Sequence, residues 1–253
     1  MQLRDMLLGI VLVMFLVFVV WTLSGYPGLA GTADKIRYST GSFLKEPQYY
    51  TGIDYTTLRS DYHLTVLPIK TVRQQVTNWT CGPVAAMNVM TYYGVNFTGG
   101  DSDEFRVSDD MHVSTTGVAD ATTTLGATPD VMASWFTSKG WNATWGTNGS
   151  IQMLRDNLKS GKPTLVEWID WGGHWVVVVG YDDRGTPVFW DDVIIFADSA
   201  DCHDDRVDGI TYFNAGEFEA MWFDSHYFPE NMRNRVYVLA VPGTTDPVTP
   251  AER

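Results

Sequence analysis

Cysteine is scarce in this chain, which has two cysteines, Cys81 and Cys202, among 253 residues. A chain with so few cysteines has no disulfide framework, so its stability must come from a hydrophobic core. The hydrophobic content of 45% is sufficient for one substantial domain with shorter appendages. The two cysteines can still pair with each other, and such a disulfide would leave neither thiol reactive.

Positive charge is also in short supply. The chain has 17 Lys and Arg against 30 Asp and Glu, which gives a net charge of −13. No basic run is present that would neutralise phosphates, so we expect no nucleic-acid partner. The acidic cluster between Asp198 and Asp208 includes Cys202 and His203, but its spacing matches neither a structural zinc site nor an EF-hand loop. We therefore expect neither a metal nor another cofactor.

What the chain does have is a long apolar segment near its N-terminus. Residues 6–23 form an apolar run of 18 residues, which is the lower length limit for a membrane-spanning helix. We predict an uncleaved signal anchor over residues 1–24, and cleavage near Ala30 or Ala33 is the alternative. Four Asn-x-Ser/Thr sequons favour an exported domain, so we expect a membrane-anchored protein with its domain on the extracytoplasmic side; they begin at Asn78, Asn96, Asn142 and Asn148.

The remaining sequence predicts a connector, a single domain and a tail. Residues 25–69 read as a connector that ends in an edge strand, and residues 242–253 read as a disordered tail. Between them, residues 70–241 start with helices that begin near Cys81, Thr128 and Ser150, and the polar tract 99–127 is expected to be a long surface loop. The strands are predicted later in the chain, at 164–169, 175–181, 188–190, 193–197 and 235–241, with a short helix at 218–223. Helices followed by an antiparallel-leaning sheet indicate an α+β domain.

Cys81 has the sequence context of a reactive thiol. It stands where a polar loop becomes a helix that Gly94 ends, and a helix N-terminus favours the thiolate form of cysteine. Gln75 lies upstream as a possible hydrogen-bond donor beside the sulfur. The simpler interpretation is that Cys81 is a small buried hydrophobic residue. A reactive role requires a base elsewhere in the chain.

His174 is the candidate base, because it follows two glycines and begins an otherwise apolar strand. A Cys–His pair gives a thiolate–imidazolium nucleophile when a third group orients the imidazole. Asp198 ends a strand that is expected to run beside that of His174, and Asp192 and Asp201 are its competitors for the orienting role. Gly173 leaves one side of the imidazole open to substrate. Two tryptophans flank these segments and are candidate walls of a cleft: Trp79 and Trp171.

Taken together, these segments resemble the bacteriocin-processing (double-glycine leader) peptidase-like family of papain-like cysteine peptidases. The resemblance covers residues 70–225 and rests on Gln75, Cys81-Gly82-Pro83, Tyr92-Tyr93-Gly94, Gly161-Lys162-Pro163, Gly173-His174 before VVVVGYD, Asp198, and an aromatic closing helix at 212–222. One departure is Ser199, which stands where the family usually has Pro. The chain holds no transporter domain or nucleotide-binding cassette, so only the scaffold and the reaction type are carried over.

The resemblance implies a papain-like fold and thiol-dependent cleavage of peptide bonds. Gln75 and the Cys81 backbone N–H would form the oxyanion hole, His174 would be the general base and then the acid, and Asp198 would orient it. Our first hypothesis is a membrane-anchored cysteine peptidase that acts on a peptide or protein substrate through a Cys81 thioester. The alternatives are an acyl transferase or amidase on cell-surface polymers, and a tethered binding module without catalysis. The sequence sets no oligomeric state.

Overall fold

The computed structural model describes residues 53–201, 206–225 and 227–243. The predicted signal anchor, most of the connector, Cys202 and the tail from residue 244 lie outside the described residues. The described helices are η1 Tyr55–Thr57, α4 Cys81–Tyr92, α5 Asp101–Asp110, α6 Pro129–Ser138, α7 Ile151–Lys159, η2 Asp170–Gly172, η3 Phe189–Asp191, α8 Ala215–Met221 and η4 Glu230–Met232. The described strands are β1 Leu64–Val66, β2 Trp141–Gly146, β3 Thr164–Trp168, β4 His174–Asp182, β5 Val193–Ala197, β6 Ile210–Asn214 and β7 Tyr237–Pro242.

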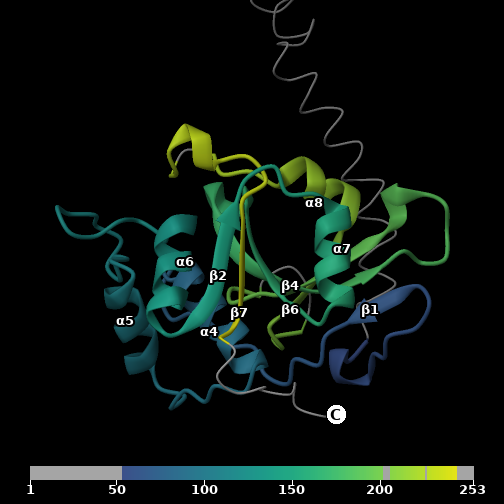
Figure 1. Cartoon of the computed structure of the whole chain (residues 1–253), viewed down its shortest axis with the longest axis horizontal. Helices are drawn as coiled ribbons and strands as arrows, with labels where there is room; N and C mark the ends of the chain where they lie inside the picture. The colour runs from purple at the N-terminus through teal and green to yellow at the C-terminus, as the bar shows by residue number, and fades with distance from the viewer. Residues whose placement is uncertain (1–52, 202–205, 226, 244–253) are drawn as a thin grey trace, which may run out of the picture. The chain divides into compact units, whose positions relative to one another are not determined.

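The strands form one antiparallel sheet in the order β2-β7-β3-β4-β5-β6 (Figure 1). β4 is the centre of this sheet, and every one of its residues is buried. β3 pairs with the first half of β4, and β1 pairs with residues 180–182 at its far end. The fold is therefore α+β with an antiparallel sheet, as the sequence predicts.

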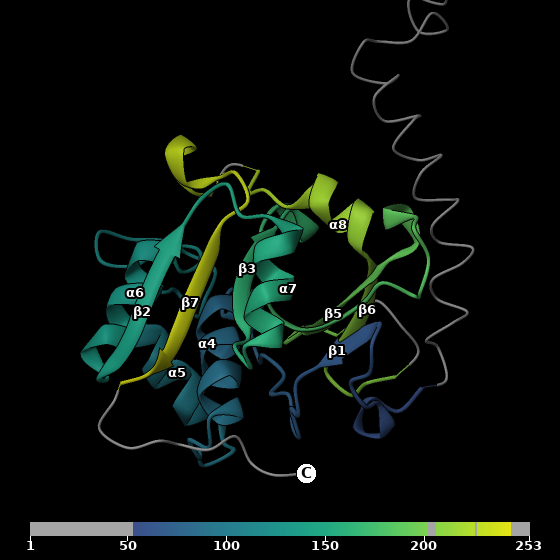
Figure 2. The ribbon, with the colours of Figure 1, turned by 45° about the vertical axis from the view of Figure 1, so that its right-hand side comes forward.

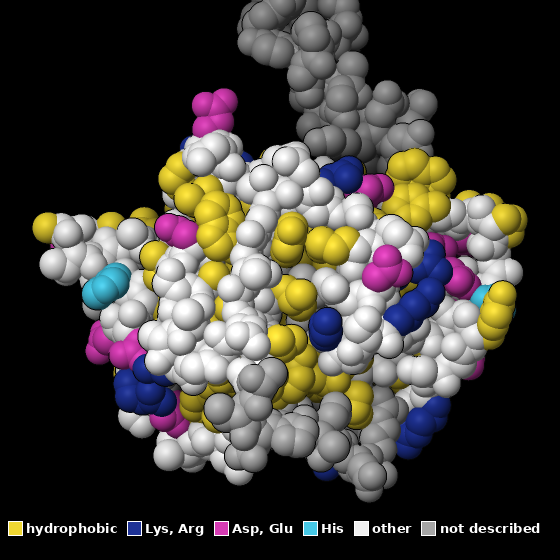
Figure 3. All heavy atoms as spheres, viewed as in Figure 1, with side chains coloured by type: hydrophobic (Ala, Val, Ile, Leu, Met, Phe, Trp, Pro, Cys, Tyr) yellow, Lys and Arg dark blue, Asp and Glu magenta, His cyan; other side chains and the backbone are white. Residues whose placement is uncertain are grey.

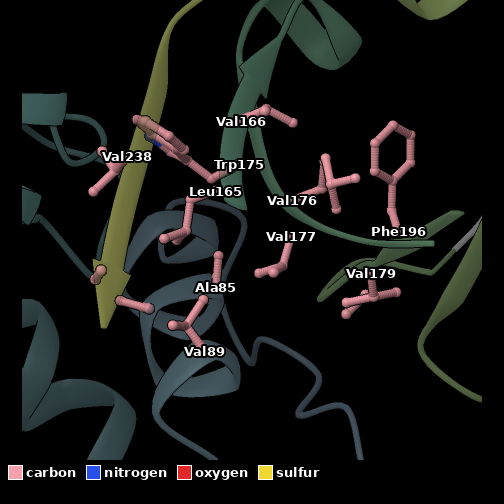
Figure 4. Packing of buried hydrophobic residues seen from close by; sticks show 14 of the residues in the cluster. Ala85, Val89, Leu165, Val166, Trp175, Val176, Val177, Val179, Phe196 and Val238 are labelled. Atoms are coloured by element: carbon pink, nitrogen blue, oxygen red, sulfur yellow. The ribbon is translucent and has the colours of Figure 1, made fainter. Parts of the chain in front are cut away.

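Helices cover both faces of the sheet (Figure 2). α4 packs on β4 and β3, and α6 packs on β2 and β7, while α7 lies on the opposite face. Figure 4 shows Ala85 and Val89 of α4 facing Leu165 of β3 and Val177 of β4. All four residues are at most 1% exposed. This contact places the N-terminus of α4 next to the start of β4.

The opposite face of the sheet carries an aromatic cluster that includes α8. Trp168 of β3 contacts Phe196 of β5, with ring centroids 5.6 Å apart, and Phe213 of β6 at 4.9 Å. Phe218 of α8 lies 5.2 Å from Phe196 and stacks on Trp222 at 5.1 Å. These ring contacts pack α8 against the end of β5, directly before Asp198.

Three of the sequence predictions for local structure are wrong. The tract 99–127 is not one long loop, because its acidic residues start α5 and stabilise the positive end of that helix. Residues 188–190 are not a strand, since Phe189–Asp191 form the short helix η3. The closing segment 212–222 is a strand before it is a helix: β6 ends at Asn214, whose side chain caps α8 by accepting from the Glu217 N–H at 2.8 Å. β2 was not predicted at all.

The surface is mixed in charge on the face shown in Figure 3. There, Lys and Arg side chains lie beside Asp and Glu side chains and form no broad basic patch. This agrees with the acidic composition and with the ion pairs of Arg155 with Asp183 at 3.2 Å and Lys139 with Asp110 at 2.8 Å.

Candidate active site

A cleft of about 530 Å³ opens where the N-terminus of α4 meets the start of β4. The sequence predicts seven residues for catalysis or substrate binding, and six of them line this cleft. Asp198 lies directly behind it. The lining comes from residues 74–79, 125–126, 173–175, 199–200 and 227–228, together with Cys81, Glu167, Trp171 and Asp224.

Cys81 is the first residue of α4 and a free, buried thiol. Burial alone would raise the pKa of Cys81, but the hydrogen bond and the charge of His174 outweigh it and lower the pKa. Backbone N–H groups of Trp175 and Gly82 lower it further. The thiolate is thus favoured at the helix N-terminus, as the sequence predicts.

His174 connects Cys81 to Asp198. Its Nε2 atom lies 2.8 Å from Oδ1 of Asp198, and its ring is also hydrogen-bonded to the Cys81 thiol. Burial would lower the pKa of His174, but the two partners raise it to about 10. The imidazolium form of His174 is therefore favoured at neutral pH, and its charge stabilises the thiolate form of Cys81.

Asp198 is held in place by groups other than histidine. Its Oδ2 accepts from Thr211 Oγ1 at 2.9 Å, and its Oδ1 accepts from the Ala200 N–H at 2.9 Å. Burial would raise the pKa of Asp198, but these bonds and His174 lower it to about 2. The two competitors have other partners: Asp192 accepts from the Tyr181 hydroxyl, and Asp201 accepts from the Gly209 N–H.

Gln75 is fixed by Ser199, the residue that stands in place of the family's usual proline. The Gln75 N–H donates to the Ser199 carbonyl at 2.9 Å, and Ser199 Oγ donates to Gln75 Oε1 at 2.7 Å. Gln75 Nε2 donates one hydrogen to the Thr77 carbonyl at 2.8 Å. Because an amide nitrogen carries two hydrogens, the second can be directed to an oxyanion. Ser199 thus orients the side chain that the resemblance places in the oxyanion hole.

Glu104 of α5 supports the same loop and was missed in the sequence. It is completely buried, and its Oε1 accepts from Thr80 Oγ1 at 2.5 Å and from the Val76 N–H at 3.0 Å. Thr80 precedes α4, yet its hydroxyl bonds Glu104 and makes no cap to the helix. A buried carboxylate far along the chain therefore sets the path from Gln75 to Cys81.

The three residues predicted to bind substrate line the same cleft as His174. Trp171 is 59% exposed, adopts a left-handed backbone with φ of 51°, and its ring centroid is 5.1 Å from that of His174. Trp79 packs on Gly117, where a Cβ would come within 2.4 Å of its Nε1 atom. A Cβ on Gly173 would come within 2.7 Å of Glu167 Oε1 and 2.8 Å of Asp224 Oδ2. Their role in binding stays a prediction.

Glu167 and Asp224 form a buried carboxyl pair in the cleft that the sequence analysis did not single out. They are 1% and 2% exposed and lie close together, since Glu167 Oε1 and Asp224 Oδ2 are both within 2.8 Å of the position of a Cβ on Gly173. Burial, with added contributions from Asp224 and Cys81, raises the pKa of Glu167 well above its usual range. No group of three or more His, Cys, Asp or Glu in the described part of the chain could hold a metal ion.

The comparisons identify the family. Residues 66–227 match the family described as Peptidase_C39 like family. This chain belongs to that family. As a member of the Peptidase_C39 like family it is a cysteine peptidase, with the α+β fold that the resemblance implies. No curated protein matches it by sequence.

Solved structures of C39 peptidases are similar to this member at low sequence identity. A C39-like peptidase from Bacillus anthracis is 15% identical with a TM-score of 0.49, and the match covers 72% of this chain and 98% of that one. The peptidase domain of Streptococcus ComA, a bifunctional ABC transporter, is 16% identical with a TM-score of 0.44 and coverage of 72% and 99%. A double glycine motif protease from an AMS/PCAT transporter, in complex with its leader peptide, is 16% identical with a TM-score of 0.41 and coverage of 69% and 93%.

The lowered pKa of Cys81 predicts rapid alkylation below neutral pH. In the full chain carrying Cys202→Ser, we expect iodoacetamide to modify Cys81 at pH 6.5, because the thiolate fraction is raised. His174→Ala removes the hydrogen bond and the positive charge, so the rate at this pH should fall about tenfold for each unit by which the pKa rises. His112→Ala, at an exposed histidine, should leave the rate unchanged. Intact-mass measurements follow the alkylation. Equal alkylation rates in the His174→Ala and His112→Ala variants would contradict the assignment of His174 as the partner of Cys81.

The buried bonds of Glu104 predict a cost when its carboxylate is removed. Glu104→Ala leaves the Val76 N–H without its acceptor and removes the shortest hydrogen bond of the Thr80 hydroxyl, so the free energy of unfolding should fall by about 1–3 kcal/mol. Glu104→Gln keeps one acceptor oxygen and should lose less. Urea unfolding measures this, with exposed Asp109→Ala on the same helix as the control. Alkylation of Cys81 should also slow in Glu104→Ala; a variant that behaves like Asp109→Ala would exclude the support role.

Proposed function

We propose that this cysteine peptidase hydrolyses peptide bonds through a Cys81 thioester, and that residues 1–24 anchor it in a membrane with the domain on the extracytoplasmic side. The observation that supports the chemistry is the hydrogen-bonded series Cys81, His174 and Asp198 at an open cleft. A buried thiolate–imidazolium pair with an orienting carboxylate is the arrangement that nucleophilic acyl transfer requires.

The proposed reaction has two halves. The Cys81 thiolate attacks the carbonyl carbon of the scissile bond, and the resulting oxyanion receives hydrogen bonds from the Cys81 backbone N–H and the Gln75 amide. The His174 imidazolium then gives its proton to the leaving amine as the C–N bond breaks, which leaves a thioester. In the second half, His174 takes a proton from water, the hydroxide attacks the thioester, and the thiolate returns as the acid product leaves.

The Gln75 amide predicts a specific kinetic defect. Gln75→Ala removes one oxyanion donor, so kcat for a fluorogenic peptide should fall about 10²–10³-fold with little change in KM. Cys81→Ala should abolish turnover, and Gln152→Ala, at an exposed position on α7, should match the unchanged chain. A Gln75→Ala loss confined to KM would show that Gln75 binds substrate and does not stabilise the oxyanion.

The membrane part of the proposal rests on the apolar run at residues 6–23. In the part of the chain that the structure describes, no helix is long and apolar enough to cross a membrane. The asparagines of three sequons, Asn96, Asn142 and Asn148, are exposed, whereas we expect no glycan on Asn78, which lines the cleft beside Cys81. Exposure is what glycosylation of an exported domain requires.

Membrane anchoring predicts a fractionation result. The full chain should stay in the membrane pellet after alkaline carbonate extraction, whereas a variant that lacks residues 2–24 should be released, because it has lost the apolar segment. A membrane-impermeant lysine reagent should label the domain in intact spheroplasts. Labelling that begins only after lysis would place the domain on the other side and exclude this topology.

A further inference from the structure

Two carboxyl groups converge in the cleft beside the thiol. Glu167 projects from β3, and Asp224 lies after α8. The Glu167 Oε1 and Asp224 Oδ2 atoms both lie within 2.8 Å of the position that a Cβ on Gly173 would occupy. Since Gly173 directly precedes His174, the carboxyl pair is adjacent to the reacting groups. It is also close enough to Cys81 for the charge of the thiolate to raise the pKa of Glu167.

The pair lacks a cation of its own on the cleft side. Both oxygens of Glu167 and Oδ2 of Asp224 are buried and have no hydrogen-bond partner among the described residues. Asp224 Oδ1 is engaged elsewhere: it accepts from the Phe228 N–H at 2.8 Å and lies 3.7 Å from Arg233 Nε. Asp224 is thus held in place through its Oδ1 atom, and its Oδ2 atom lies on the side of Glu167.

The remaining lining suits a positively charged group. Among the residues that line the cleft in the described structure, none is Lys or Arg. Arg233 pairs with the far oxygen of Asp224, whereas neither oxygen of Glu167 has a partner among the described residues. A buried carboxyl group without a counter-ion is costly, and a cation bound beside Glu167 would relieve that cost. Aromatic rings attract cations through their faces, and five line this cleft: Trp79, Trp171, Trp175, Tyr227 and Phe228.

We propose that Glu167 and Asp224 form a subsite for a cationic nitrogen, supplied by a Lys or Arg side chain of the peptide within a residue or two of the scissile bond. This subsite rests on the proposed peptidase function and names the substrate class. The same chemistry would also recognise an amine that acts as acyl acceptor, so the experiments separate the two sources. Glu167 and Asp224 act here as specificity residues and take no part in bond making.

The kinetic test uses the full chain and matched pairs of fluorogenic peptides. Each pair differs at one position near the scissile bond, with lysine in one member and norleucine, which has the same four-carbon side chain without the ammonium group, in the other. At one position we expect kcat/KM for lysine to exceed that for norleucine by about tenfold or more, the value of a hydrogen bond to a charged group. Glu167→Gln and Asp224→Asn should bring this ratio toward one, and exposed Glu230→Gln should leave it unchanged. A ratio near one at every position in the unchanged chain, with cleavage intact, would overturn the subsite and leave the proposed function standing.

The binding test does not require turnover. In the full chain carrying Cys81→Ala, calorimetry should show tighter binding of N-acetyl-lysine methylamide than of its norleucine analogue, and Glu167→Gln should remove the difference. If the binding difference is found but the unchanged chain cleaves no peptide, the subsite is supported and the proposed function is contradicted. Equal binding of the lysine probe by the Glu167→Gln variant would overturn the subsite. Unchanged alkylation of Cys81 in Glu167→Gln, tested without Cys81→Ala, establishes that the site is still folded.

A third measurement assigns the source of the cation. When lysine amide is added to a cleavage reaction, mass spectrometry distinguishes a hydrolysed product from an amide conjugate. Conjugates that form faster than acid product in the unchanged chain, but not in Glu167→Gln, would assign the subsite to an amine acceptor. Acid product alone, with the lysine preference retained, assigns it to the peptide side chain.

Discussion

The packing of α4 across β4 determines whether this protein has a reactive thiol. Cys81 is the first residue of α4 and His174 is the first residue of β4, so their contact depends on how helix and strand cross. Ala85, Val89, Leu165 and Val177 fill the interface behind them (Figure 4). An ion pair at this depth has a large desolvation cost, which hydrogen bonds must offset. Asp198 supplies one of these bonds and is itself fixed by Thr211 and Ala200.

The loop before Cys81 shows the same principle of support from distant elements. Arg73 is held by the Asn88 side chain of α4, Gln74 donates to the Asp198 carbonyl at 3.0 Å, and Gln75 bonds Ser199. Val76 then donates to Glu104 of α5. The loop before the thiol is thus anchored to α4, to the segment after β5 and to α5. A loop fixed in this way can hold an amide donor without losing conformational entropy in each reaction cycle.

Sequence reasoning was most successful where a local pattern carries the information. The helix that begins at Cys81 and the strand that begins at His174 follow from periodicity and from the glycines beside them. The contact of Asp198 with the His174 imidazole follows from the expectation that their strands are neighbours. The roles of Glu104 and Glu167 could not be predicted from the sequence, because nothing in the local pattern around either residue indicates that it is buried. Ser199 was read as a departure from the family pattern, and only the structure shows its bond to Gln75. Short segments such as β2 and η3 were missed or misassigned because their partners are distant in the chain.

The electrostatics of the cleft link the carboxyl pair to the thiolate. An ionised Glu167 beside Cys81 would oppose thiolate formation, since two negative charges would share one buried space. Burial and Asp224 raise the pKa of Glu167 and so favour its neutral form, which leaves the His174 charge to stabilise the sulfur. A cation bound between Glu167 and Asp224 would let Glu167 ionise without that conflict, because the added positive charge compensates for it. His174 balances the thiolate and Arg233 lies beside Asp224, so a cationic ligand in the proposed subsite would balance the remaining carboxylate, that of Glu167.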